Sequence, residues 1–316
     1  MQLTLLVLLT ANMLAQAPAT ATGQELFADP EFHQGFMLTA ASHPAPKEEL
    51  GPLHFGEKYN GFKPEWRMAQ WGTRELLQPQ PYICAPIVNR CWADNQAKEV
   101  VYEYWGPEPA GIGLVVHGDY EYDGRMRAAG EAWPHLLIEQ RFSKPILPKD
   151  WKTLSFSMKC RIEFCKAAPW SEGKLDPKLH TAQVSAFWTV HNVSKGNPDC
   201  GDMIWFGIPF FDARYPIPPA YYALDAGKED ASGKFICMLD GKRFWKNPTG
   251  DGAPQSLEVD MLPLLREALT IAQEHGFLKN TQFEDLAMDS FNLGWEIPGP
   301  YDAAFHVRGL SMRGVE

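Results

Sequence analysis

From about residue 98 onward, the chain is a succession of short β-branched and aromatic runs separated by Gly and Pro. The clearest run, from Leu154 to Phe164, places an apolar side chain at every second position. A period of two is typical of a strand that buries one face. Similar runs cover residues 99–105, 111–117, 135–142, 181–190, 203–211, 234–239, 292–296 and 304–313. Such a series predicts antiparallel sheets rather than alternating strands and helices.

One segment has the helical period instead. Met261 to Glu274 carries Leu262, Leu265, Leu269 and Ala272 at helical spacing, with Asp260 as its expected N-cap. Many strands and a single late α-helix predict an all-β antiparallel β-sandwich. The chain shows no internal repeat or linker, so we expect one β-sandwich domain over residues 22–316.

The first residues have the pattern of an export signal. Leu3 to Leu14 is an apolar run of the length of a signal-peptide core, followed by the small-x-small site Ala19-Thr20-Ala21. We expect a signal peptide at residues 1–21 and a secreted or periplasmic protein, with an uncleaved anchor as the alternative. No later segment has 18 consecutive apolar residues, so no membrane span is expected after cleavage.

Composition narrows the classes of partner. The formal net charge is −10 and no Lys/Arg cluster stands out, which argues against nucleic acid. The chain has 11 Trp, and indole rings either fill a core or stack on sugar faces. The six cysteines form no metal or haem motif, so no metal and no cofactor are expected. Cys84 and Cys91 are close enough to bridge a short loop, although the full pairing cannot be derived from spacing.

The C-terminal third carries an ordered set of local motifs. The Asp260-led helix is followed by His275-Gly276-Phe277-Leu278, Phe283 to Leu286, Gly294 to Gly299 and a final alternating strand from Phe305 to Met312. Together with Met203-Ile204-Trp205, this order resembles the family-12 glycoside hydrolases, the endoglucanase and xyloglucanase jelly rolls. The resemblance implies a concanavalin-like jelly roll, a polysaccharide or oligosaccharide partner, and cleavage of a β-glucan-type chain.

Transferred onto this sequence, the family pattern assigns the general acid/base to Glu296. The nucleophile of the family lies two residues before the Met, and here that position is Gly201. The nearest carboxylate is Asp202, which faces the groove only if a β-bulge reverses the strand. Glu139 and Asp212 are further candidate carboxylates, and Asp212 is as easily a salt-bridge partner of Arg214.

Several side chains beside these carboxylates are candidates for contacting sugar. His191 and Gln183 are eight residues apart in one expected strand and therefore share a face. The predicted substrate-binding residues are Trp188, Trp205, Met203, Trp295, His191 and Gln183.

Three functions follow from these patterns. The first is an endo-acting glycoside hydrolase that uses Glu296 with Asp202 or another carboxylate, because cleavage needs two carboxyl groups across the bond. The second is a glycan-binding β-sandwich without catalysis, which the missing carboxylate at Gly201 favours. The third is a polysaccharide lyase in which His191 or a Tyr removes a proton. A lyase needs a basic groove, for which Arg125, Arg127 and Arg161 are candidates.

Overall fold

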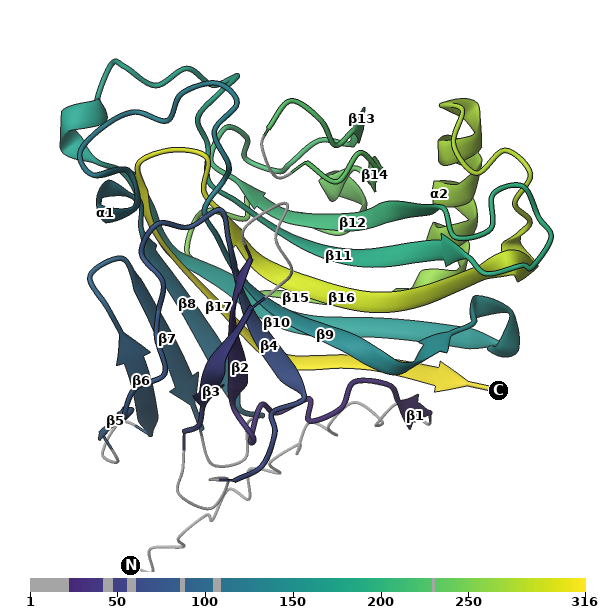
Figure 1. Ribbon diagram of the computed structural model, residues 1–316, viewed down its shortest axis with the longest axis horizontal. Coiled ribbons are helices and arrows are strands. Elements are labelled where there is room, and N and C mark those ends of the chain that lie inside the picture. Colours follow the sequence, from purple (N-terminus) through teal and green to yellow (C-terminus); the bar gives the residue numbers. More distant parts are fainter. Residues whose placement is uncertain (1–22, 42–47, 56–60, 86–88, 105–108, 229–230) are drawn as a thin grey trace, which may run out of the picture.

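The computed structural model describes residues 23–41, 48–55, 61–85, 89–104, 109–228 and 231–316, and the expected signal peptide lies outside them. Two large β-sheets pack face to face, and one α-helix of several turns lies beside them (Figure 1). The prediction of an all-β sandwich of the jelly-roll type with a late helix is confirmed.

The first sheet contains four of the nine strands that the sequence runs predicted, β7, β8, β10 and β17. Its strand order is β15-β10-β17-β8-β7-β6-β5, and β1 also pairs with β17. The bounds are β1 (Gln24–Glu25), β5 (Ile83–Ala85), β6 (Arg90–Asp94), β7 (Lys98–Glu103), β8 (Gly111–His117), β10 (Thr153–Ala167), β15 (Gln255–Asp260) and β17 (Tyr301–Val315).

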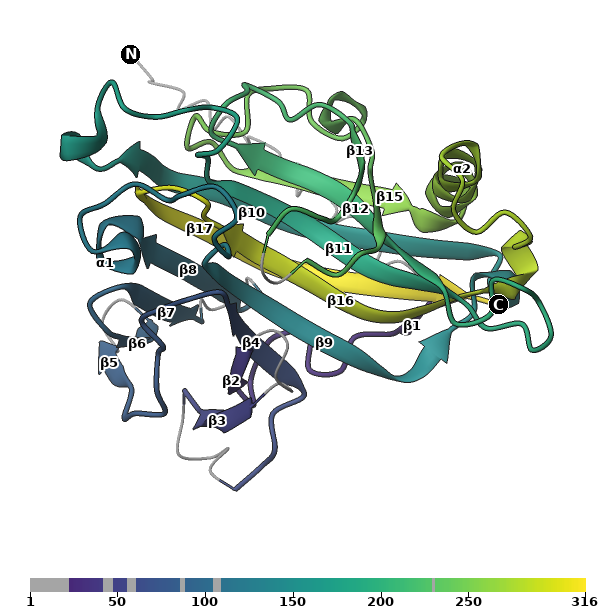
Figure 2. The same cartoon turned by 45° about the horizontal axis from the view of Figure 1, so that its top comes forward.

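The second sheet supplies the face on which the candidate site lies. Its order is β13-β14-β12-β11-β16-β9-β4-β2-β3, and Figure 2 shows β9, β16, β11 and β12 side by side. The bounds are β2 (Phe36–Ala41), β3 (Glu48–Leu53), β4 (Trp66–Trp71), β9 (His135–Ile146), β11 (Gln183–Asn192), β12 (Met203–Asp212), β13 (Tyr221–Leu224), β14 (Phe235–Met238) and β16 (Leu286–Glu296).

Alternation within each strand builds the core between the sheets. The predicted face of β10 is buried from Leu154 to Ile162, and it meets Trp188 of β11 and Phe291 of β16. Phe156 packs edge-on against Trp188 with ring centroids 4.8 Å apart. The driving force is the removal of apolar surface from water, and aromatic side chains remove the most.

Helix α2 (Met261–Glu274) has the bounds that its sequence period predicted. The Asp260 carboxylate accepts a hydrogen bond from the Leu262 backbone N–H, which satisfies one of the unpaired donors of the first turn. Gly276 follows the helix with φ +91, a conformation that costs glycine little. Shorter helical segments are α1 (Gly118–Tyr122) and the 3-10 turns Pro148–Asp150, Pro169–Ser171, Gly241–Arg243 and Phe283–Asp285.

The run at residues 234–239 forms β14 (Phe235–Met238), which pairs with one strand in each direction. β14 lies parallel to β12 and antiparallel to the preceding β13. After β14 the Asp240 carboxylate accepts the Lys242 N–H and begins a 3-10 turn. Elsewhere, β5 and β6 are joined by a disulfide between Cys84 and Cys91, the pair that spacing made possible.

A buried charged cluster lies on the outer face of the first sheet. The Glu103 carboxylate accepts a 2.6 Å hydrogen bond from Arg90 Nε and lies 2.8 Å from His306 Nε2. His306 reaches Glu103 across β8 because Gly111 is there, and a Cβ at that position would lie 2.7 Å from the imidazole. Burial raises the pKa of Glu103, but His306 and Arg90 outweigh it and lower that pKa to about 2.

This cluster predicts a loss of stability in acid. The folded-state pKa of Glu103 lies below its unfolded value of 4.5, so its contribution is present above that pH and is lost as pH falls toward 2. We expect Glu103→Gln to lower the free energy of unfolding at pH 7 by ~2–3 kcal/mol. Urea unfolding of both proteins at several pH values tests this. The difference between them should shrink between pH 4.5 and 2, and a constant difference would contradict the prediction.

Candidate functional site

A groove of about 620 Å³ lies on the outer face of the second sheet, over β9, β16, β11 and β12. Along β11, Val184, Ala186 and Trp188 point into the core, and the alternate residues Gln183 and Phe187 line the groove. The loop 127–133, residues 214–228 and Ser232 contribute further lining residues. Ordinary strand alternation therefore produces a core on one face and the groove on the other.

Glu296 lies at the end of β16, in the centre of one row of groove residues. It is paired with Gln183 of β11 on one side and His135 of β9 on the other. Gln183 Nε2 donates a 3.0 Å hydrogen bond to Glu296 Oε2, and His135 Nε2 lies 3.9 Å from the same oxygen. The Glu296 side chain is 16% exposed, so it is held in place while part of it remains open to the groove.

The orientation of His135 follows from its other ring nitrogen. His135 Nδ1 lies 2.5 Å from the Trp133 carbonyl oxygen, which can only accept a hydrogen bond. We therefore assign the proton to Nδ1, which directs Nε2 toward Glu296. The row presents a carboxylate, an amide and an imidazole to anything bound in the groove.

Asp212 completes the row on the other side of Gln183, with which it is paired across β11 and β12. Its Oδ1 accepts hydrogen bonds from Thr181 Oγ1 at 2.8 Å and from Arg214 N and Nε at 3.0 and 2.9 Å. Its Oδ2 accepts one from Arg214 Nη2 at 2.5 Å. The salt bridge that the sequence suggested for Asp212 and Arg214 is therefore present.

A β-bulge turns Asp212 toward the groove. The pairing of β11 with β12 shifts between Val184 and Ser185, which leaves Phe210 as an extra residue. Before the bulge, odd-numbered residues such as Trp205 face the groove, whereas after it the even-numbered Asp212 does. Without the extra residue, Asp212 would point toward the core.

Asp202 does not lie near Glu296, which corrects the predicted catalytic pair. β12 and β16 both run antiparallel to β11, so they are parallel to each other. Asp202 precedes the start of β12, while Glu296 ends β16, and about nine residues of strand, roughly 30 Å, separate them. Asp202 instead forms a 2.7 Å ion pair with Lys234.

The predicted substrate-binding residues divide into three groups. Gln183 and Trp205 line the groove. Met203 and His191 pair with each other at the far end of β11, outside the groove-lining residues, so His191 is remote from Gln183 although the two share a face. Trp188 and Trp295 are fully buried between the sheets, which corrects the expectation that they contact sugar. Alternate residues of a strand face opposite sides, and both tryptophans stand at positions of β11 and β16 that face the core.

The sequence interpretation missed three groove residues, His135, Trp71 and Trp133. His135 is the first residue of the predicted strand 135–142. Trp71 is the last residue of β4 and lies on the same face of that strand as the solvent-facing Arg67. These positions were visible as strand ends, but no spacing in the sequence indicates that β4, β9 and β16 are neighbours. Trp133 has Arg127 and Lys228 near its ring, 5.6 and 4.6 Å from the centroid.

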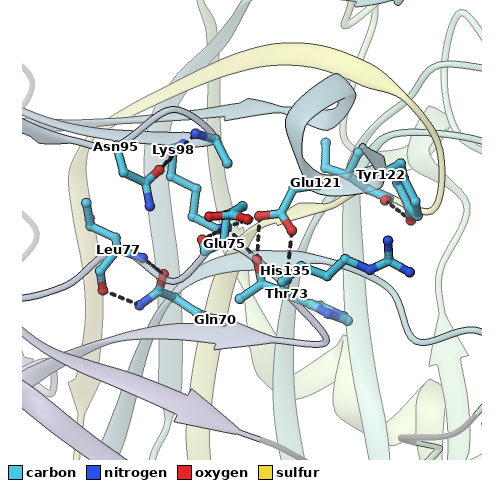
Figure 3. A network of polar contacts seen from close by, with 12 residues as sticks. Gln70, Thr73, Glu75, Leu77, Asn95, Lys98, Glu121, Tyr122 and His135 are labelled. Carbon is cyan, nitrogen blue, oxygen red and sulfur yellow. Dashed lines mark hydrogen bonds and ion pairs between the residues drawn. The ribbon is translucent and has the colours of Figure 1, made fainter. Parts of the chain in front are cut away.

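A buried polar network supports this end of the groove (Figure 3). Lys98 and Glu121 have fully buried side chains in direct contact. Glu121 also accepts hydrogen bonds from Thr73 Oγ1 and, at 2.9 Å, from Arg74 N, which fixes the turn that follows Trp71. Burial lowers the pKa of Lys98 to about 7, and the charge of Glu75 partly opposes this shift. A charge without a partner at this buried position would therefore destabilise the folded protein.

Helix α1 connects this network to the Glu296 strand. Its residue Glu121 holds the turn after Trp71, and the next residue, Tyr122, donates a 2.9 Å hydrogen bond to the carbonyl oxygen of Ile297. Within the described ranges, no cluster of three His, Cys, Asp or Glu residues could hold a metal ion. In the same part of the chain, no helix is long and apolar enough to cross a membrane.

No family model matches the sequence, and no curated protein matches it. Among solved structures, the chain is similar to a family 12 xyloglucanase from Bacillus licheniformis, with 10% identity over 75% of this chain and 98% of that chain and a TM-score of 0.39. It is also similar to a family 11 xylanase from Neocallimastix patriciarum, with 9% identity over 75% and 96% of the two chains and a TM-score of 0.37.

A third similar structure is the xyloglucanase domain of NopAA from Sinorhizobium fredii in complex with cellobiose. It is 12% identical over 76% of this chain and 100% of that chain, with a TM-score of 0.35. These similarities are low, so the fold assignment rests on the strand order and the site on its own side-chain geometry. The chain is thus a two-sheet jelly roll that is structurally similar to glycoside hydrolases.

Proposed function

We propose that this protein binds a β-linked polysaccharide in the groove and hydrolyses it, with Glu296 as the proton donor. The observation that carries the proposal is the position of Glu296, a partly open carboxylate among the side chains, several of them aromatic, that line the groove. Aromatic rings present flat apolar faces to the C–H groups of a sugar. A carboxylic acid in such a position can protonate the leaving glycosidic oxygen.

Two neighbours fit Glu296 for this role. Gln183 holds one carboxylate oxygen by a hydrogen bond, which fixes the direction of the other oxygen. His135 presents Nε2 toward the carboxylate and can exchange a proton with it through one water molecule. The experiment that tests the proposal is reducing-end release by the purified protein on soluble β-glucans, xyloglucan and xylan.

Glycan binding without cleavage is the second candidate. The specific observation in its favour is that Asp202 lies far from Glu296, while Asp212 is engaged by Arg214. Calorimetric binding without any release of reducing ends would support this candidate. A lyase that combines His191 with Gln183 is disfavoured, because the two residues lie at opposite ends of β11.

We also propose that the chain is exported, on the basis of the apolar run Leu3 to Leu14 and the small-x-small site before residue 22. A polysaccharide too large to enter a cell requires an enzyme or binding protein outside it. Recovery of the protein only from the cytoplasm, with residues 1–21 still attached, would contradict this part of the proposal.

Groove binding predicts a specific effect at Trp205, whose indole lines the groove and donates to Ser232 Oγ at 2.9 Å. We expect Trp205→Ala to weaken polysaccharide affinity about five- to tenfold, the loss of ~1 kcal/mol of stacking. Trp92→Ala is the matched control, because Trp92 lies on β6 of the other sheet. Equal affinities of the two variants, measured by calorimetry, would place the binding surface elsewhere.

A further inference from the structure

The residue that partners Glu296 is not the one that the family resemblance suggested. Glu296, Gln183 and Asp212 are aligned in one row across β16, β11 and β12. Glu296 and Asp212 are therefore separated by two interstrand spacings, about 9–10 Å between backbones. Both residues line the groove, and Gln183 forms its floor between them.

We propose that Asp212 is the catalytic base and that the protein cleaves its substrate with inversion at the anomeric carbon. This inference rests on the proposed function. A separation of roughly 6.5–9.5 Å between the two carboxyl groups leaves space for a water molecule beside the sugar and suits inversion, whereas roughly 5–5.5 Å suits retention through a covalent intermediate. The backbone spacing of the two strands corresponds to the longer of these separations. Asp212 and Glu296 lie two strands apart with the Gln183 side chain between them, and this spacing favours a base that acts through water over one that attacks the sugar directly.

The hydrogen bonds of Asp212 are compatible with this role. Three donors occupy Oδ1, but Oδ2 accepts only from Arg214 Nη2 among the described residues. Oδ2 accepts a single hydrogen bond from the described part of the chain, so one of its lone pairs is left for a water molecule. The Arg214 guanidinium and Thr181 hydroxyl also hold the carboxylate in a fixed direction, which a base that positions water requires.

The reaction balances with these two groups alone. Asp212 takes a proton from water as the water oxygen bonds to the anomeric carbon. The glycosidic carbon–oxygen bond breaks, and Glu296 gives its proton to the departing oxygen. The products are a new reducing end and a shortened chain, with Asp212 protonated and Glu296 ionised. Proton exchange with solvent restores both groups.

Proton NMR of the first-formed reducing end, recorded with the wild-type protein on a β-linked glycan that it cleaves, tests the inference. The expected first product is the α-anomer, which then equilibrates. Early appearance of the β-anomer would overturn inversion while leaving the proposed hydrolase intact. No release from any glycan in the panel would instead refute the hydrolase, so the two failures are distinguishable.

A variant adds an independent readout of Asp212. We expect Asp212→Asn to reduce kcat at least 100-fold with little change in substrate affinity. Asp289→Asn, on β16 but outside the groove-lining residues, is the control. Full activity of folded Asp212→Asn would overturn the assignment. If that variant does not fold, the anomer released by the wild-type protein still tests the proposal: the α-anomer requires a base that activates water, and the β-anomer excludes that role for Asp212.

Discussion

Glu296→Gln is expected to reduce reducing-end release at least 100-fold while leaving polysaccharide affinity nearly unchanged. Loss of a general acid typically costs a factor of 10²–10⁴ in rate. Gln is isosteric with Glu, and its amide oxygen can still accept the hydrogen bond from Gln183. The groove and its aromatic lining should therefore persist. The measurement is initial-rate release of reducing ends at saturating substrate, together with calorimetric affinity for the same glycan.

The control for this prediction is Glu258→Gln, because Glu258 is exposed on β15 of the other sheet. We expect that variant to behave as the wild type. Equal hydrolysis by the Glu296 and Glu258 variants would remove Glu296 from the chemistry. Loss of both affinity and rate in Glu296→Gln would point to a role in binding.

The second large effect is expected on stability, at the buried contact between Lys98 and Glu121 (Figure 3). Removing one partner of a buried ion pair leaves the other charge without compensation, which typically costs 3–5 kcal/mol. We expect Lys98→Met to lower the free energy of unfolding by about that amount. The turn at Thr73 should loosen as well, because Glu121 and Lys98 both bind the Thr73 hydroxyl.

A double-mutant cycle separates the ion pair from simple loss of packing. In Lys98→Met/Glu121→Gln, the amide oxygen can still accept from Arg74 N, and the amide N–H can donate to the Thr73 hydroxyl in place of the bond that Glu121 accepts from it, so no charge is left buried. We expect the double variant to recover at least half of the stability lost by Lys98→Met, as measured by urea unfolding. If the double variant is less stable than the wild type by the sum of the two single effects, the two residues are not coupled.

The fold could be predicted because its determinants are local in the chain. The alternation from Leu154 to Ile162 predicted both a strand and its buried face, and Asp260 marked the beginning of α2. Strand pairing is not local. The same apolar run can form a hairpin or lie parallel to a distant strand, and residues 234–239 took the second course beside β12.

The site was only partly predictable for the same reason. Glu296 was identified from the motif around it. Gln183 was identified because the alternation of its strand places it on the same face as His191. Trp188 was predicted to contact sugar, but it is buried in the core. A high Trp content is equally typical of a large core and of a sugar-binding groove, so composition does not distinguish the two. The Asp202 assignment depended on transferring a family spacing, and the register of β12 against β16 places that residue at the wrong end.

By itself, the sequence determined the class of fold, most strand positions, the late helix and one central carboxylate. The fold class, the strands and the helix follow from side-chain periodicity and capping, which act over a few residues, whereas the carboxylate was found from the family resemblance of the motif around it. Only the tertiary structure decided which side chains meet Glu296. His135 arrives through the pairing of β9 with β16, and Asp212 through the register of β12. The extra residue Phe210 turns Asp212 toward the groove, because one inserted residue exchanges the faces of a strand.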